Sequence, residues 1–268
     1  GRDEIFVTNQ DGNKLESFAL ETKPKKKGFR YIWKDANLYF RIIRPMGKKP
    51  VLMSQGSGYG NPFQGPIKKV LFKKGKYQQG PKLKTPEVYG THFILYGLTQ
   101  QDLNGNGVAE TVLLDSSYHL RVYSHRGRLI VKSNDYYGHD PRLIDVGVEN
   151  DVSESVVEGT PVRFKGRLEF VKVGGDRFLA LPMNQTLGGG LLSKLVVVEN
   201  SGLALLKLTG EGFDKAFESS KQKGYLAASR VIPNKNEMGA TVYMLRIDQS
   251  VLTKNLNSTF STYEWPLK

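Results

Sequence analysis

The nine residues from Asp102 to Glu110 carry the clearest chemical pattern in the sequence, D-x-N-G-N-G-x-x-E. Side chains that end in oxygen stand at positions 1, 3, 5 and 9, and the backbone carbonyl at position 7 can join them. Calcium takes about six to eight hard oxygen ligands at about 2.3–2.6 Å, and this spacing wraps such oxygens around one point. We therefore predict a calcium site made by Asp102, Asn104, Asn106, the Val108 carbonyl and Glu110.

The composition of this segment also indicates what kind of loop it is. Gly105 and Gly107 permit the positive φ angles that a tight loop requires. Only Asp102 and Glu110 are charged, so we expect a modest calcium affinity. An apolar strand pattern follows Glu110 directly, which distinguishes the loop from an EF-hand. The alternative interpretation is a metal-free Asn-Gly turn between two strands.

Most of the remaining sequence has the periodicity of β-strands. Ile5–Thr8 and Leu120–Tyr123 alternate apolar and polar residues, whereas Val112–Leu114 and Leu195–Val198 are apolar runs typical of strands buried on both faces. Gly, Asn and Asp turn signals separate these segments. One short segment, Phe213 to Lys221, has a helical pattern. The sequence predicts an all-β sandwich, barrel or propeller.

Internal repeats favour the propeller. The segment that starts at Gly107 is similar to the one that starts at Gly1, and a weaker copy starts at Asn234. The first offset, 106 residues, corresponds to two units of about 53 residues, and the second, roughly 130 residues, to two somewhat longer units. Units of about 40–50 residues are typical of four-stranded propeller blades. We predict about five blades, the first and last incomplete, with residues 136–159 as an excursion between blades. The predicted blades are Gly1 to Asp35, Asn37 to Lys84, Tyr89 to Asp135, Thr160 to Gly210, and Tyr225 to the end.

The loop pattern, followed by an apolar strand and a short aromatic strand, resembles the FG-GAP/VCBS repeat. The match is good over Phe93 to Val131 and partial over Gly1 to Leu20. It is poor over Ile232 to Met244, where Ile232 and Ala240 replace the two acids. The resemblance implies an integrin-α-like β-propeller, usually seven-bladed, in which calcium stiffens a loop. It also implies a secreted, cell-surface or periplasmic protein that acts in adhesion, scaffolding or ligand binding.

The start of the chain resembles the second half of such a loop. Gly1 and Glu4 correspond to Gly107 and Glu110, so the ligands at positions 1, 3 and 5 would lie upstream. We therefore expect residues 1–268 to form either a single propeller domain or the C-terminal portion of one. In the second case roughly 100–180 residues of propeller would precede Gly1, on the same or another polypeptide.

Positive charge is concentrated in about a quarter of the sequence. The net charge is +13, and the stretch from Thr22 to Lys84 holds 17 Lys and Arg against one acidic residue, Asp35. This predicts a basic face for an anionic partner: an acidic polysaccharide, nucleic acid, phospholipid headgroups or an acidic protein. No nucleic-acid recognition motif accompanies it. The alternative is solvated hairpin tips and lysines that protect strand edges. The predicted anion-binding residues are Lys25, Lys26, Lys27, Lys48, Lys49, Lys68, Lys69, Lys73, Lys74 and Lys76.

Several function classes lack their required residues. The sequence has no cysteine, and its four histidines lack zinc-binding spacing. It has no nucleophile elbow and no run of about 20 apolar residues for a membrane span.

The leading hypothesis is a non-enzymatic, extracytoplasmic binding propeller. The alternatives are an assembly or filament-associated subunit that completes its propeller with another polypeptide, and a propeller enzyme that acts on polysaccharide through paired carboxylates.

Overall fold

The computed structural model of the chain describes residues 4–11, 14–22, 28–43, 49–58, 61–88, 93–146, 160–186, 198–209, 212–236, 238–249 and 256–267. The regular elements in these ranges are all β-strands, so they offer no helix that could cross a membrane. The chain divides into two compact units, and each is described by itself. Unit 1 holds Gly1–Thr85, Gly90–Leu95 and Ile144–Val162, and unit 2 holds Pro86–Tyr89, Tyr96–Leu143 and Arg163–Lys268.

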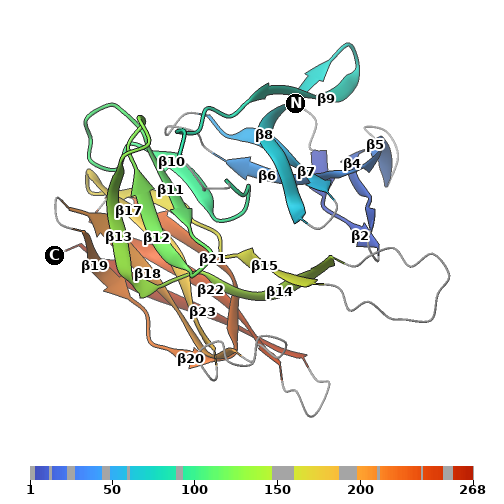
Figure 1. Cartoon of the computed structure of the whole chain (residues 1–268). Coiled ribbons are helices and arrows are strands. Elements are labelled where there is room, and N and C mark those ends of the chain that lie inside the picture. Colours follow the sequence, from blue (N-terminus) through green and yellow to red (C-terminus); the bar gives the residue numbers. More distant parts are fainter. Residues whose placement is uncertain are drawn as a thin grey trace. The chain divides into compact units, whose positions relative to one another are not determined.

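Unit 1 contains two antiparallel sheets that match predicted blades one and two. The first sheet has the order β1-β4-β5, with a small β2-β3 hairpin beside it in sequence, and the second has the order β6-β7-β8-β9 (Figure 1). The strands are β1 (Glu4–Val7), β2 (Gln10–Asp11), β3 (Lys14–Leu15), β4 (Ser17–Thr22), β5 (Phe29–Ala36), β6 (Leu38–Ile43), β7 (Val51–Gly58), β8 (Asn61–Lys73) and β9 (Lys76–Lys82).

Unit 2 contains three antiparallel sheets that correspond to predicted blades three, four and five, although the fourth spans residues 169–223 rather than Thr160 to Gly210. Their orders are β10-β11-β12-β13, β16-β17-β18-β19 with β20 also paired to β18, and β21-β22-β23. The strands are β10 (Leu98–Gln101), β11 (Glu110–Leu114), β12 (His119–Tyr123), β13 (Leu129–Tyr136), β16 (Glu169–Val173), β17 (Asp176–Thr186), β18 (Val198–Leu208), β19 (Phe213–Glu218), β20 (Gln222–Lys223), β21 (Tyr225–Pro233), β22 (Gly239–Gln249) and β23 (Leu256–Pro266). The predicted fold class is confirmed: the chain is all-β and has the five successive blade sheets of a β-propeller, with three strands in the first and last.

Blade four of unit 2 is buried on both faces. Leu181 and Leu206 pack with blade three in one hydrophobic cluster, whereas Leu203 and Leu205 pack with blade five in another. Neighbouring residues of a strand point to opposite faces, so a strand between two blades needs apolar residues at consecutive positions. The continuous apolar runs in the sequence therefore reflect the stacking of blades, and Val112 to Leu114 of blade three is buried in the same way.

An aromatic cluster holds the two sheets of unit 1 together. The ring of Phe6 on β1 lies 5.4 Å from that of Phe40 on β6 and 5.1 Å from that of Tyr77 on β9, both edge-to-face. Trp33 on β5 stacks on Tyr77 at 6.0 Å. Such ring pairs add about 0.5–1.5 kcal/mol each beyond the area that they bury. The first two blades are thus joined by aromatic rings together with aliphatic residues such as Val70 and Leu52.

Two sequence predictions about blade four are wrong. Phe213 to Lys221, predicted as a helix, contains strand β19. The pairing of β18 with β19 shifts register between Leu205 and Leu206, and Phe213 and Phe217 pack into different clusters on opposite faces. Because of this bulge, two apolar residues four positions apart pack on opposite faces of the strand. Their spacing in the sequence resembles that of an amphipathic helix.

The second correction concerns the start of blade four. Residues 160–165 form β15 (Thr160–Lys165), which pairs with β14 (His139–Val146) rather than opening the blade. Strand β14 occupies the first part of the predicted excursion, and residues 147–159 lie outside the described residues. Of the predicted strand Leu195–Val198, only Val198 is described, and it begins β18.

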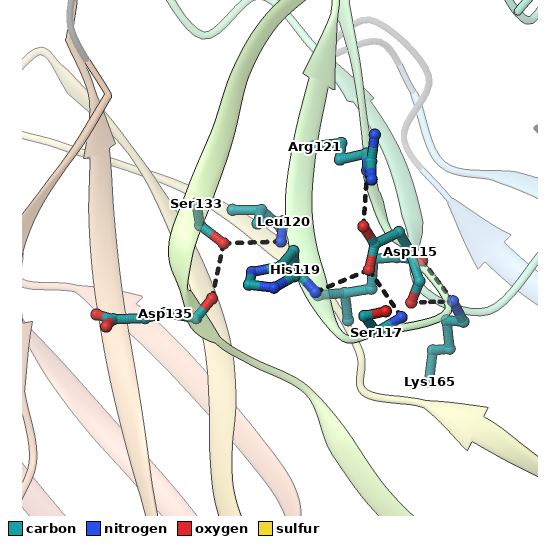
Figure 2. Close-up of polar contacts among 9 residues, drawn as sticks. Asp115, Ser117, His119, Leu120, Arg121, Ser133, Asp135 and Lys165 are labelled. Carbon is teal, nitrogen blue, oxygen red and sulfur yellow. Dashed lines mark hydrogen bonds and ion pairs between the residues drawn. The ribbon is translucent and has the colours of Figure 1, made fainter.

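Figure 2 shows the polar contacts of the turn after β11. Asp115 Oδ1 accepts hydrogen bonds from the N–H groups of Ser117 (2.9 Å) and His119 (3.0 Å), and Oδ2 accepts one from Arg121 Nε (2.7 Å). Burial acts to raise the pKa of Asp115, but these hydrogen bonds outweigh it and the pKa is lowered. Both carboxylate oxygens are therefore used to hold the turn.

Lys165, at the end of β15, contacts the same turn. Its Nζ donates to the carbonyl oxygen of Leu114 at 2.6 Å and also to that of Asp115 (Figure 2). Burial lowers the pKa of Lys165 to about 8, and the charge of Asp115 acts in the opposite direction. The folded protein thus loses this proton at a lower pH than the unfolded chain does.

We predict that the wild-type protein becomes more stable between about pH 8 and 10.5, relative to a Lys165→Met variant. In this window the unfolded chain keeps a proton that the folded state has lost, so a rise in pH favours the folded state. Urea unfolding of both proteins across the window measures the difference. Lys132→Met, at an exposed position of β13, is the control and should follow the wild type. Parallel pH curves for Lys165→Met and the wild type would contradict the prediction.

Candidate functional sites: the Asp102–Glu110 loop and the β8–β9 hairpin

The predicted calcium loop connects β10 and β11 in unit 2 and wraps around the carboxylate of Asp102. Asp102 Oδ1 accepts a hydrogen bond from the Gly105 N–H (2.7 Å), and Oδ2 accepts one from the Gly107 N–H (3.1 Å). Both glycines have φ of +83°, a conformation that other residues rarely adopt. The predicted need for glycine at these two positions is confirmed.

The other polar side chains of the loop also turn toward its backbone. Asn104 Oδ1 accepts from the Asn106 N–H (3.0 Å), and Asn106 Oδ1 accepts from the Val108 N–H (2.8 Å). Glu110 accepts from the Leu103 N–H and from Asn104 Nδ2, each at 2.8 Å. The structure therefore brings the four predicted side chains together in one hydrogen-bonded loop.

The core of unit 2 anchors this loop at both ends. Leu103 belongs to the cluster between blades three and four, and Glu110, only 3% exposed, begins the buried strand β11. Burial raises the pKa of Glu110, while the hydrogen bond from the Leu103 N–H acts in the opposite direction. A carboxylate can be buried here because two donors satisfy it.

Arg177, the second residue of β17, was missed by the sequence analysis. Its Nη1 lies 3.3 Å from Asp102 Oδ2. A Cβ placed on Gly105 would lie 2.6 Å from the same nitrogen, so the guanidinium is seated against the loop. Nothing in the loop sequence indicates this contact, because the packing of blade four against blade three creates it.

The donor set of the loop fits calcium in its chemistry. Carboxylate and amide oxygens are hard ligands of the kind that calcium prefers, and the loop holds four such side chains. The described part of the chain has no group of three or more His, Cys, Asp or Glu residues that could hold a metal. A calcium ion here would depend on two carboxylates and neutral oxygens, beside the positive charge of Arg177.

Only part of the predicted basic face can be placed. Lys25, Lys26, Lys27 and Lys48 lie outside the described residues, and Lys49 is exposed. The other five predicted lysines are on the β8–β9 hairpin of unit 1 or in its turn: Lys68, Lys69, Lys73, Lys74 and Lys76. The turn itself is Lys74-Gly75, with φ of 50° and 76°. Two positive φ values are typical of the type I′ turn of tight hairpins.

The hairpin register places lysines directly opposite one another. Lys73 pairs with Lys76 beside the turn, and Lys68 pairs with Lys82 farther along. Like charges in directly opposite positions destabilise a sheet. Within the described ranges, Lys69, Lys73, Lys74, Lys76 and Lys82 make no ion pair, and Lys68 donates to Gln79 Oε1 at 3.3 Å. Lys82 is not among the predicted anion-binding residues, because its position opposite Lys68 depends on the register of β8 with β9.

No protein-family model and no curated protein matches the sequence. The resemblance to the FG-GAP/VCBS repeat thus stays a prediction from the loop residues. The functional argument rests on the geometry of the loop and of the lysine hairpin.

We predict that Glu110→Ala lowers the free energy of unfolding by about 1–3 kcal/mol, because it leaves the buried Leu103 N–H without its acceptor. Glu110→Gln keeps one acceptor oxygen and should cost less. Urea unfolding measures both, with Glu199→Ala at an exposed position of β18 as the control. A Glu110→Ala variant as stable as this control would show that the hydrogen bond does not hold the loop.

Proposed function

We propose that this chain is a non-catalytic binding propeller that holds an acidic polysaccharide against its β8–β9 hairpin. The proposal rests on one observation: the hairpin has two cross-strand pairs of lysines, Lys73 with Lys76 and Lys68 with Lys82. Their mutual repulsion opposes folding, and no acidic residue stands within the hairpin sequence to relieve it. A polyanion would supply the missing negative charge.

The spacing of the lysines suits a linear polyanion. Lys68 and Lys73 stand five positions apart on β8, which corresponds to about 16 Å along a strand, and this odd spacing places them on opposite faces of the hairpin. Charged groups thus recur along the hairpin rather than at a single point. Phe72, on the same face of β8 as Lys68, is 60% exposed and offers an apolar surface to a sugar ring. Lysine provides a compact, strongly hydrated charge without the planar fork with which arginine recognises phosphate.

We further propose that the Asp102–Glu110 loop takes calcium as a stabilising ion. Two observations support this proposal. The oxygens have the required spacing in the sequence, and in the structure the same side chains accept hydrogen bonds from the loop backbone. Bound calcium would supply the positive charge that draws these oxygens together. Sites of low charge in extracellular modules bind calcium with Kd of about 10⁻⁴–10⁻³ M. A site of this kind fills where calcium is abundant, so we propose an extracytoplasmic location.

For the hairpin, we predict that the wild-type protein binds immobilised heparin at low salt and that Lys73→Gln/Lys76→Gln weakens binding about 3- to 10-fold. Each exposed ion pair contributes about 0.2–1 kcal/mol, and salt screens it. Elution in a salt gradient and Kd values at two ionic strengths measure the effect. Lys132→Gln/Lys172→Gln removes the same charge from exposed positions of unit 2 and serves as the control.

The same assay identifies competing explanations. An equal loss in the unit 2 control would mean that net charge, not the hairpin, drives binding. Binding that does not respond to salt would refute an electrostatic contact. Tighter binding of single-stranded DNA or of polyglutamate than of heparin would overturn the polysaccharide assignment in favour of nucleic acid or of an acidic protein.

For the loop, we predict that about 10 mM calcium raises the melting temperature by a few degrees over chelator, because calcium binds only the folded state. At a calcium concentration ten times Kd, binding raises the free energy of unfolding by about 1.4 kcal/mol. Asp102→Asn should remove the shift, and magnesium at equal concentration controls for ionic strength. An unchanged melting temperature of the wild type, or an equal shift in Asp102→Asn, would refute the calcium proposal.

A further inference from the structure

A fixed positive charge lies at the carboxylate that would be the first calcium ligand. Arg177 Nη1 is 3.3 Å from Asp102 Oδ2, the same oxygen that accepts a hydrogen bond from the Gly107 N–H. The side chains of both residues are partly shielded from water, with 31% and 20% of their surfaces exposed. The pair therefore contributes more than a fully solvated surface pair would.

The fold holds Arg177 in this position. It lies just after the Gly174-Gly175 turn of the β16–β17 hairpin and pairs across that hairpin with Lys172. Its backbone thus belongs to blade four, while its guanidinium reaches the loop of blade three. Gly105 provides the space, because a side chain there would require the guanidinium to move. The contact ties two blades of unit 2 to each other.

We propose that Arg177 competes with calcium for Asp102, so that the loop has two alternative cations. In the arginine-bound state, Asp102 is neutralised by blade four and the loop is tied to that blade. In the calcium-bound state, the ion takes the carboxylate and the guanidinium is released. This inference rests on the proposed calcium loop and says how that loop is regulated. Arg177 weakens metal binding and sets the calcium concentration at which the loop changes from the arginine-bound to the calcium-bound state.

The charges at the site favour such a competition. The two carboxylates of the loop carry two negative charges, and Arg177 already balances one of them. A divalent ion within a few ångströms of a guanidinium is repelled, and this repulsion is large where water is partly excluded. Removal of the guanidinium leaves the negative charge of Asp102 without its counter-charge and available to the metal. The loop then becomes less stable without calcium and binds calcium more tightly.

The test compares the wild type with Arg177→Gln, Asp102→Asn and Arg230→Gln. Arg230→Gln is the matched control, because it breaks an exposed 3.0 Å ion pair with Glu169 in the same unit without touching the loop. Calcium chloride titrations by calorimetry give Kd, and melting curves in chelator and in calcium give stability. We expect Arg177→Gln to bind calcium about 5- to 10-fold more tightly than the wild type. It should also melt below the wild type in chelator and recover or exceed it in calcium.

Each other outcome overturns a defined part of the argument. Equal calcium affinity in Arg177→Gln and the wild type would leave the calcium loop in place and refute the competition. Weaker binding in Arg177→Gln would make Arg177 a support of the metal-bound loop. Absence of binding in both would refute the calcium proposal and the competition together. A change in Arg230→Gln equal to that in Arg177→Gln would assign the effect to general charge loss.

Discussion

Burial of a sheet on both faces is the constraint on which unit 2 depends. A blade between two others cannot present a polar face to water, so consecutive residues such as Leu203, Ala204 and Leu205 are all apolar and fully buried. The Asp102–Glu110 loop and the Asp115 turn stand at opposite ends of β11, and each satisfies its own backbone with its own side chains.

Glu110 is the point at which the loop and the core meet. It is a carboxylate in a buried strand, tolerated because the Leu103 N–H and Asn104 Nδ2 donate to it. The loop is thus anchored to the core of blade three through Glu110 and Leu103. Arg177 balances the charge of Asp102 in this loop, and the proposed calcium ion would change that balance.

The sequence predicted what depends on local spacing. Strand alternation, the apolar runs of buried strands and the oxygen positions from Asp102 to Glu110 all follow from residues close together in the chain, and the structure agrees with them. Contacts that depend on strand register or on the packing of blades could not be predicted from local spacing. A bulge in the pairing of β18 with β19 gave Phe213–Lys221 its misleading helical spacing. The pairing of Lys68 with Lys82, and the approach of Arg177 to Asp102, join residues from separate strands.

The two sites differ in where their counter-charge comes from. In unit 2, basic side chains at sheet surfaces and turns commonly find carboxylates of the same unit, as Arg121 does with Asp115 and Lys207 with Asp176. The β8–β9 hairpin holds no carboxylate of its own, although its Tyr77 donates a hydrogen bond to Glu4 of β1. Its opposed lysines are left to solvent ions or to a partner. A tightly folded I′ hairpin fixes these charges in place, so the proposed polyanion would meet a surface that needs little ordering on binding.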